Sequence, residues 1–191
     1  DQLIREVEKR LPLVDGVILQ DYSKGVLSES TLQHIIQSAK KLGKRVMVDP
    51  YRTTPVRFYR GADLMTPNFE EALMLSGRNS DDSIPLSESL VEVGGDLMKG
   101  IESNTMVITR GKDGVSLFEK DKALKIPTFA RQVFDVTGAG DTFIAALSLA
   151  WVSGLSLEES CWLANHAAGV VVGKVGCVPC SIEELKASIS N

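Results

Sequence analysis

The sequence predicts an α/β fold in which a doubly wound, mostly parallel sheet is covered by helices on both faces. Two observations carry this prediction. Short, continuous apolar runs alternate with segments of helical periodicity along almost the whole chain, as expected for parallel strands that are buried on both faces. The composition, with 43% hydrophobic and 24% charged residues, is that of an ordinary globular protein. A length of 191 residues suffices for a single domain over residues 1–191.

Each element follows from its local pattern. The expected strands are residues 16–19, 45–48, 62–65 and 105–109, followed by a hairpin of 114–118 with 123–126. The expected helices are an amphipathic one at the start of the chain, then 28–42, 69–75, 87–99, 139–152, 157–172 and 181–190. The helices at 139–152 and 157–172 are apolar nearly all round, so both are expected to be buried. Residues 77–85 are the best loop candidate.

Polar residues mark the expected helix starts. Ser28 or Ser30 can cap the helix at 28–42, and Gly43 lies just past its end. Ser181 and Glu184 have the spacing of a capping box for the last helix.

The composition also excludes several classes of protein. No apolar run approaches the roughly 18–20 residues that span a bilayer, and a net charge of −4 carries no signal for nucleic acid or an anionic membrane. Three cysteines are too few for a disulfide scaffold, and no signal peptide is in view, so a cytoplasmic location is expected. The first residue is Asp1 rather than Met, which favours a piece of a longer chain.

The segment most informative about chemistry is DVTGAGDTF at residues 135–143. Gly138 and Gly140 let the backbone approach a ligand closely, and the N–H groups at a helix start form an anion site. Asp141 suits a general base that deprotonates an alcohol attacking a phosphoryl group. A dinucleotide fingerprint is disfavoured, since Phe143 replaces its third small residue, and no Walker A loop is present. A plain N-cap followed by a packing helix remains the alternative.

This segment and three others together resemble the ribokinase-like (PfkB) family of carbohydrate kinases. The pattern at 135–141 is similar to the family's C-terminal signature. NFEE at 68–71, TRGKDG at 109–114 and NHAAG at 165–169 follow the family's order, and the match runs over nearly the whole chain. The resemblance implies the ribokinase-like fold, an ATP-dependent kinase activity, and ATP, Mg²⁺ and K⁺ as cofactors.

The resemblance also implies roles in catalysis. Asp141 would be the base and would contact the substrate hydroxyl, while Gly138, Ala139 and Gly140 would form the anion hole for the transferred γ-phosphoryl group. Asn68 and Glu71 would hold the Mg²⁺-phosphate region through water. From the residues alone, an alternative is that Asn68 and Glu71 cap and solvate the helix that follows Pro67.

Further residues match the family's nucleotide, substrate and cation sites. Those implied are Thr109, Gly111 and Gly114 along the nucleotide, Asn165 beside the adenine, and, for the monovalent cation, Asp135 and Thr137 with backbone carbonyls near Val171, Lys174 and Gly176. Alternatives stay open for three of them. Thr109 and Gly111 can be a strand end and turn, and Asn165 can be a buried amide bonded to backbone. Lys24 is either a substrate-binding cation or a solvated loop residue. The Cys177-x-x-Cys180 pair suggests structural loop thiols rather than redox or zinc chemistry.

Within the family, DYSKG at 21–25, TPN at 66–68 and AGVVVGKVG at 168–176 resemble heptose-7-phosphate kinases. The implied reaction is phosphorylation of heptose 7-phosphate at O1 in ADP-heptose synthesis for the lipopolysaccharide core. Tyr51 stands where Asp-Pro-Lys is usual, so another sugar or nucleoside substrate stays open.

Family members are longer and begin with further strands and a lid. The chain is therefore expected to be a C-terminal portion, and a nucleotide-binding module without turnover is a second hypothesis. Because uncovered sheet edges self-associate, a homo-oligomer is expected, with a sugar phosphate and ATP as ligands and neither nucleic acid nor membrane as partner.

Overall fold

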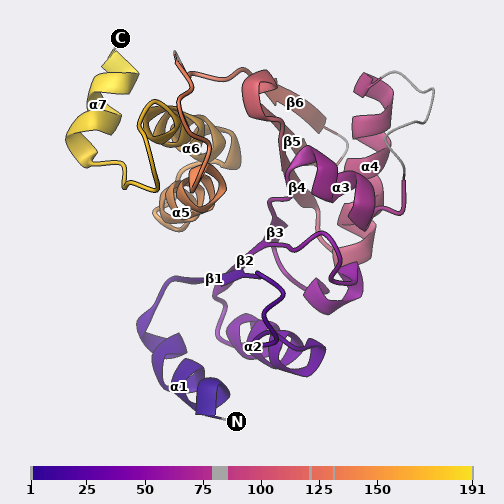
Figure 1. Cartoon of the computed structure of the whole chain (residues 1–191). Coiled ribbons are helices and arrows are strands. Elements are labelled where there is room, and N and C mark those ends of the chain that lie inside the picture. The colour runs from indigo at the N-terminus through magenta and orange to yellow at the C-terminus, as the bar shows by residue number, and fades with distance from the viewer. Residues whose placement is uncertain (1, 79–85, 121, 131, 191) are drawn as a thin grey trace. The chain divides into compact units, whose positions relative to one another are not determined.

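The computed structural model describes residues 2–78, 86–120, 122–130 and 132–190 (Figure 1). Contacts divide the chain into two compact units, one formed by Asp1–Ile108 with Phe118–Ala123 and the other by Thr109–Leu117 with Leu124–Asn191. That the chain forms a single domain stays a prediction. Within the described ranges, every helix is too short or too polar to cross a membrane.

The first unit contains the predicted parallel strands. They are β1 (Gly16–Gln20), β2 (Arg45–Asp49) and β3 (Leu64–Met65), in the order β1-β2-β3 and parallel throughout. The predicted strand at 62–65 is shortened at its start, because the N–H of Ala62 donates to the carbonyl of Tyr59 and closes a turn instead of joining the ladder. The carboxyl ends of these strands lie at one edge, where open α/β sheets bind ligands.

Helices α1 (Gln2–Arg10), α2 (Glu29–Lys41), α3 (Phe69–Leu75) and α4 (Leu86–Ile101) belong to this unit, with 3-10 turns at Leu11–Leu13 and Val56–Tyr59. Of the two candidate caps for α2, the structure uses Ser28, whose hydroxyl accepts from the N–H of Thr31 at 3.2 Å. Leu32, Ile35, Ile36 and Ala39 of α2 are buried as their spacing predicts. They join a core that also holds Val46, Val48, Met65, Leu97 and Ile108.

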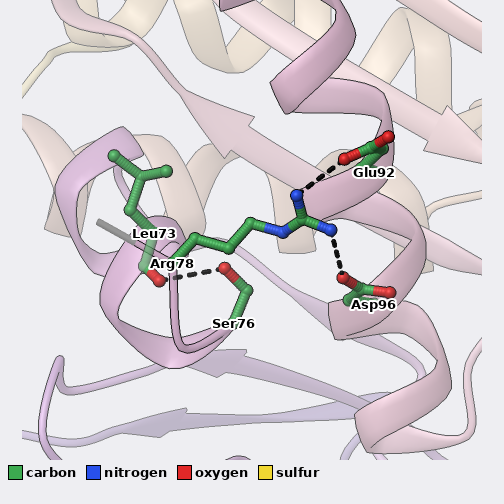
Figure 2. Close-up of polar contacts among 5 residues, drawn as sticks. All are labelled: Leu73, Ser76, Arg78, Glu92 and Asp96. Atoms are coloured by element: carbon green, nitrogen blue, oxygen red, sulfur yellow. Dashed lines mark hydrogen bonds and ion pairs between the residues drawn. The ribbon is translucent and has the colours of Figure 1, made fainter. Parts of the chain in front are cut away.

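An ion-pair cluster links α3 to α4 (Figure 2). The guanidinium of Arg78 lies 2.6 Å from a carboxylate oxygen of Glu92 and 3.0 Å from one of Asp96, both on α4. The backbone N–H of Arg78 donates to the carbonyl of Leu73, which anchors it to the end of α3. Arg78 therefore ties the two helices together, while the rest of the predicted loop, residues 79–85, lies outside the described residues.

The remaining strands form a second sheet in the order β4-β5-β6, from β4 (Thr105–Thr109), β5 (Val115–Glu119) and β6 (Lys122–Ile126). The predicted pairing of these two strands is confirmed, since β5 and β6 follow each other in the chain and are neighbours in the sheet. Between β3 and β4 the ladder is interrupted. The carbonyl of Asp63 accepts from the hydroxyls of Ser103 and Thr105, both at 2.6 Å, rather than from a neighbouring strand.

Three helices follow in the second unit: α5 (Ala139–Val152), α6 (Leu157–Val172) and α7 (Ile182–Ser190). The bounds of α5 and α6 agree with the prediction, and the two helices pack against each other (Figure 1). The expectation that both are buried all round is wrong, because Leu149 on α5 is 68% exposed and Trp162 on α6 is 37% exposed. The predicted box at the start of α7 is present, with Ser181 and Glu184 bonding each other's backbone N–H.

Candidate active site

A pocket of about 510 Å³ lies within the second unit. Six residues predicted for the nucleotide or phosphate site line it: Thr109, Gly111, Gly114, Ala139, Gly140 and Asn165. The other lining residues are Lys112, Val115, Thr128, Ala130, Val133, Val136, Phe143, Ala168, Gly169 and Val172. Small and apolar side chains therefore dominate walls that are interrupted by a few polar groups, which is the usual character of a small-molecule site.

One wall is the tight turn that follows β4. Arg110 donates its N–H to the carbonyl of Gly114 at 2.8 Å, and a 3-10 turn spans Gly111–Asp113. Gly114 has φ 79°, and a Cβ there would lie 2.1 Å from the carbonyl oxygen of Ile126. Only glycine fits this position, so the backbone itself forms the pocket surface. The strand end and turn that were the alternative for Thr109 and Gly111 are therefore present, and both residues also line the pocket.

A second wall comes from α6 and the segment that follows β6. The side-chain amide of Asn165, which is buried, donates to the carbonyl of Pro127 at 2.6 Å. The backbone partner expected for a buried amide is therefore present. A Cβ on Gly169 would lie 3.1 Å from the backbone nitrogen of Ala130, so α6 approaches this segment closely.

The third wall is the start of α5, where the N-cap is Gly138 with φ 77°. A glycine cap provides no side chain to bond the N–H groups of the first turn. Ala139 and Gly140 line the pocket, and Asp141, the next residue, is exposed in the same turn. A Cβ on Gly138 would lie only 2.8 Å from the Cys177 sulfur, so this thiol packs directly against the cap.

Hydrogen bonds join several of the residues predicted to bind a monovalent cation. One carboxylate oxygen of Asp135 accepts from the N–H and the hydroxyl of Thr137, at 2.9 and 2.7 Å, and the other accepts from the N–H of Gly176 at 3.0 Å. These bonds, with the Thr137 hydroxyl contributing most, lower the pKa of Asp135 below its ordinary value. Val171 and Lys174 are joined separately, through the N–H of Lys174 and the carbonyl of Val171.

Asn68, Glu71 and Lys24 belong to the first unit. Asn68 and Glu71 form a capping box at the start of α3, with reciprocal bonds of 3.0 and 2.9 Å. The helix-cap alternative thus describes their local contacts, and the Mg²⁺ role stays a prediction. Burial raises the pKa of Glu71 above its ordinary value. Lys24 is exposed. Within the described ranges, no three His, Cys, Asp or Glu side chains gather as a metal-binding group.

The sequence reasoning missed two features. Thr128, Ala130 and Val133 line the pocket, although the segment after the hairpin carries no motif of its own. In the first unit, the buried carboxylate of Asp21 accepts from the hydroxyls of Tyr59 and Thr54, at 2.6 and 2.8 Å. Burial and this carboxylate raise the pKa of Tyr59 above its ordinary value. An aspartate directly after a strand was the signal available for the second feature.

The fold places the chain among ribokinase-like proteins. It superposes on ribokinase of Arabidopsis thaliana, solved with ribose and ATP, with a TM-score of 0.84 and 25% identity over 97% of this chain and 59% of the other. Phosphofructokinase-2 of Escherichia coli, solved with potassium, has the same fold, with a TM-score of 0.82 at 16% identity over 100% of this chain and 62% of the other.

The chain belongs to the pfkB family of carbohydrate kinases, whose sequence model matches residues 4–184. It is similar to the bifunctional protein HldE of Pectobacterium atrosepticum, with 44% identity over 188 residues. It is also 42% identical over 190 residues to the protein of that name from Proteus mirabilis. These matches cover 98% and 99% of this chain, and the chain spans 38% of the length of either relative.

Proposed function

We propose that this chain forms the nucleotide-binding part of an ATP-dependent sugar kinase that phosphorylates heptose 7-phosphate at O1, in ADP-heptose synthesis. The observation that carries the proposal is the pocket of about 510 Å³ that ends at the glycine-capped start of α5, beside Asp141. A pocket with mostly small and apolar walls, next to a helix N-terminus without a side-chain cap, suits a nucleotide, because the base needs apolar surface and the phosphates need N–H donors.

Two kinds of observation support the assignment of a nucleotide to this pocket: the residues of its walls and a solved structure of the same fold. Gly111, Gly114 and Gly169 let the backbone approach a planar base closely. The Arabidopsis ribokinase, with the same fold, was solved with ATP. The adenine is assigned to the part of the pocket between the turn after β4 and α6, and the phosphates to the start of α5.

The chemistry follows from the residues at the start of α5. The Asp141 carboxylate takes the proton from the O1 hydroxyl of the sugar, and that oxygen attacks the γ-phosphorus. The bond from the γ-phosphorus to the β–γ bridging oxygen breaks, and ADP leaves. The N–H groups of Gly138, Ala139 and Gly140 would stabilise the charge on the transferred group. In this structure the N–H of Ala139 donates to the carbonyl of Val136 at 3.1 Å, so it would have to exchange that partner for the phosphoryl oxygen.

Two cations fit the donor sets that are present. Mg²⁺ would be held by the ATP phosphates and by water, since it keeps several of its waters in such sites. A role of Asn68 and Glu71 in this Mg²⁺ region is what the family resemblance implies. K⁺ would be held beside α5 by Asp135, Thr137 and carbonyls near Val171, Lys174 and Gly176. The Asp135 carboxylate, which its hydrogen bonds keep ionised, supplies the negative charge for that site. Mg²⁺ would neutralise charge on the phosphates during transfer.

The choice of sugar rests on similarity to the HldE proteins, and the choice of a cytoplasmic homo-oligomer rests on the sequence. Tyr51 favours a second candidate, a related kinase for another sugar or a nucleoside. Its ring lies 5.9 Å from the guanidinium carbon of Arg52, a cation–π contact that a lysine at this position would not make. Rates on a panel of sugar phosphates and nucleosides separate the two candidates.

Thermal unfolding with and without Mg-ATP, in the presence of K⁺, tests nucleotide binding. At about 100 times Kd, one-site binding adds about 2.7 kcal/mol, which raises the Tm by about 5–10 °C for a chain of this size. The rise is expected to shrink when Mg²⁺ and K⁺ are removed. A cooperatively unfolding sample whose Tm does not move would contradict the nucleotide site.

A further inference from the structure

His166 occupies a buried aromatic cage on α6. It is 5% exposed, and its ring stacks on Phe129 with centroids 3.9 Å apart and planes 14° apart. Trp162 covers another side of the ring, with centroids 4.3 Å apart. Nδ1 of His166 is 2.8 Å from the Ser188 hydroxyl of α7, and Nε2 is buried with no hydrogen-bond partner in the described part of the chain. None of the roles assigned above uses this ring.

The stacked partner of His166 belongs to the pocket wall. Phe129 lies between Thr128 and Ala130, which both line the pocket. Four contacts join α6 to residues 127–130. The first is the ring of Trp162, which lies edge-on to Phe129 with centroids 5.8 Å apart, and the other three come from later positions on the same helix. Asn165 bonds the carbonyl of Pro127, His166 stacks on Phe129, and Gly169 packs on Ala130.

We propose that His166 is a positioning residue for nucleotide binding: its neutral ring holds residues 127–130 in place as the pocket wall, and Ser188 of α7 fixes the ring. The role of the pocket itself rests on the proposed function. The Asn165 bond holds the first residue of this segment, and the stacked ring of His166, together with the edge of Trp162, holds Phe129 in its middle.

The cage requires the neutral form of the ring. A protonated ring carries an N–H on both nitrogens. Because Nε2 has no hydrogen-bond partner in the described residues, protonation would bury a charge whose one hydrogen-bond partner there is the Ser188 hydroxyl. Burial accordingly lowers the pKa of His166 below its ordinary value. The ionisable side chains on the two helices that contribute to the cage are Glu158 and Glu159 on α6, and Glu183, Glu184 and Lys186 on α7.

Two substitutions separate stacking from charge. His166→Phe keeps an aromatic ring that cannot ionise, and His166→Ala removes the ring. The chain has two histidines, so His34→Gln, on the exposed face of α2, is the matched control. Hydrogen exchange of the 128–130 amides without nucleotide is expected to speed up at least tenfold in His166→Ala and less than threefold in His166→Phe. Mg-ATP Kd at pH 7.5 is expected to rise about 5- to 20-fold in His166→Ala only.

The pH dependence of the Mg-ATP Kd is a second measurement, and a residue with a purely structural role would not change it. Between pH 7.5 and 5.5, the Mg-ATP Kd of the unmodified chain is expected to rise at least threefold more than that of His166→Phe. Equal pH profiles, or unchanged amide exchange in His166→Ala, would overturn the positioning role. If the unmodified chain does not bind Mg-ATP, the proposed function fails, and the exchange data still decide the role of His166. Should His166→Ala not fold, Ser188→Ala, which frees the ring from α7, is expected to give faster exchange of the same amides.

Discussion

The side-chain amide of Asn165 donates a 2.6 Å hydrogen bond to the carbonyl of Pro127, which lies 38 residues earlier in the chain. This bond joins α6 to the segment after β6. Asn165 lines the pocket, and Pro127 directly precedes Thr128, which also lines it. A residue that resembles the family's adenine-side position therefore also holds the wall of that site.

Replacement of Asn165 by leucine leaves the Pro127 carbonyl without this donor. We expect a loss of about 1–2 kcal/mol in the free energy of unfolding, together with about a tenfold rise in Mg-ATP Kd. Urea unfolding and calorimetric titration measure the two effects. Gln37→Leu, at an exposed position of α2, is the control and should change neither. An Asn165→Leu chain with unchanged stability would show that the bond contributes nothing.

Asp141→Asn tests the catalytic base. Asparagine keeps the size of the side chain but accepts a proton poorly, so kcat for heptose 7-phosphate is expected to fall by about 10²–10⁴, with the Mg-ATP Kd unchanged. The rate is measured in this chain and in any longer natural form of it. Glu158→Gln, in the first turn of α6, removes a carboxylate from a comparable helix position and should leave kcat as it was. An undiminished kcat in Asp141→Asn would rule out this base.

Gly138→Ala tests the cap of α5. A φ of 77° is costly for alanine, and its Cβ would meet the Cys177 sulfur at 2.8 Å. We expect a stability loss of about 1–3 kcal/mol and weaker Mg-ATP binding. In a Cys177→Ala background the steric part is expected to disappear and the backbone part to remain. Gly95→Ala in α4, where a Cβ meets nothing within 4 Å, should instead stabilise the chain by up to about 1 kcal/mol. Equal changes in stability for Gly138→Ala and Gly95→Ala would contradict the assignment of Gly138 as a cap that requires glycine.

Tyr59→Phe removes one donor from the buried carboxylate of Asp21. A hydrogen bond to a charged group contributes about 1.5–3 kcal/mol, so the free energy of unfolding is expected to fall by that amount. Tyr22→Phe, at a side chain that is 55% exposed, is the control. Chemical denaturation compares the two variants. If both variants lose the same small amount of unfolding free energy, the Tyr59 hydroxyl does not stabilise the Asp21 carboxylate.

The ion pair between Glu184 of α7 and Lys174, in the segment before α7, is expected to be sensitive to acid. The ion pair with Lys174, at 2.5 Å, and the bonds from Ser181 lower the pKa of Glu184 to about 2. A lowered carboxyl pKa stabilises the folded state fully above the ordinary value of 4.5, and this contribution is lost as pH falls toward about 2. Lys174→Met is expected to raise the pKa of Glu184 toward its ordinary value. The pH interval over which the Glu184 carboxylate loses its contribution to stability then becomes narrower. Titration of the Glu184 carboxyl by NMR measures it, and a pKa near 4.5 in the unmodified chain would contradict the pairing.

Much of the fold could be predicted because its signals are local. Residues 139–152 and 157–172 are helical as expected, since apolar periodicity and the polar or glycine caps beside each helix act within a few residues. The apolar runs at 16–19 and 105–109 gave strands for the same reason. The residues that resemble the nucleotide motif at 109–114 and the start of α5 line one pocket, although the sequence separates them by about 25 positions.

The sequence by itself determined the alternation of strands and helices, the caps and the family, because each depends on neighbouring residues or on a continuous motif. Tertiary structure decided the partner of Asn165, the burial of Asp21 beneath Tyr59 and the stacking of Phe129 on His166. The first two pairs are each separated by 38 residues. No local pattern specifies such partners, since they depend on which surfaces meet when the chain folds.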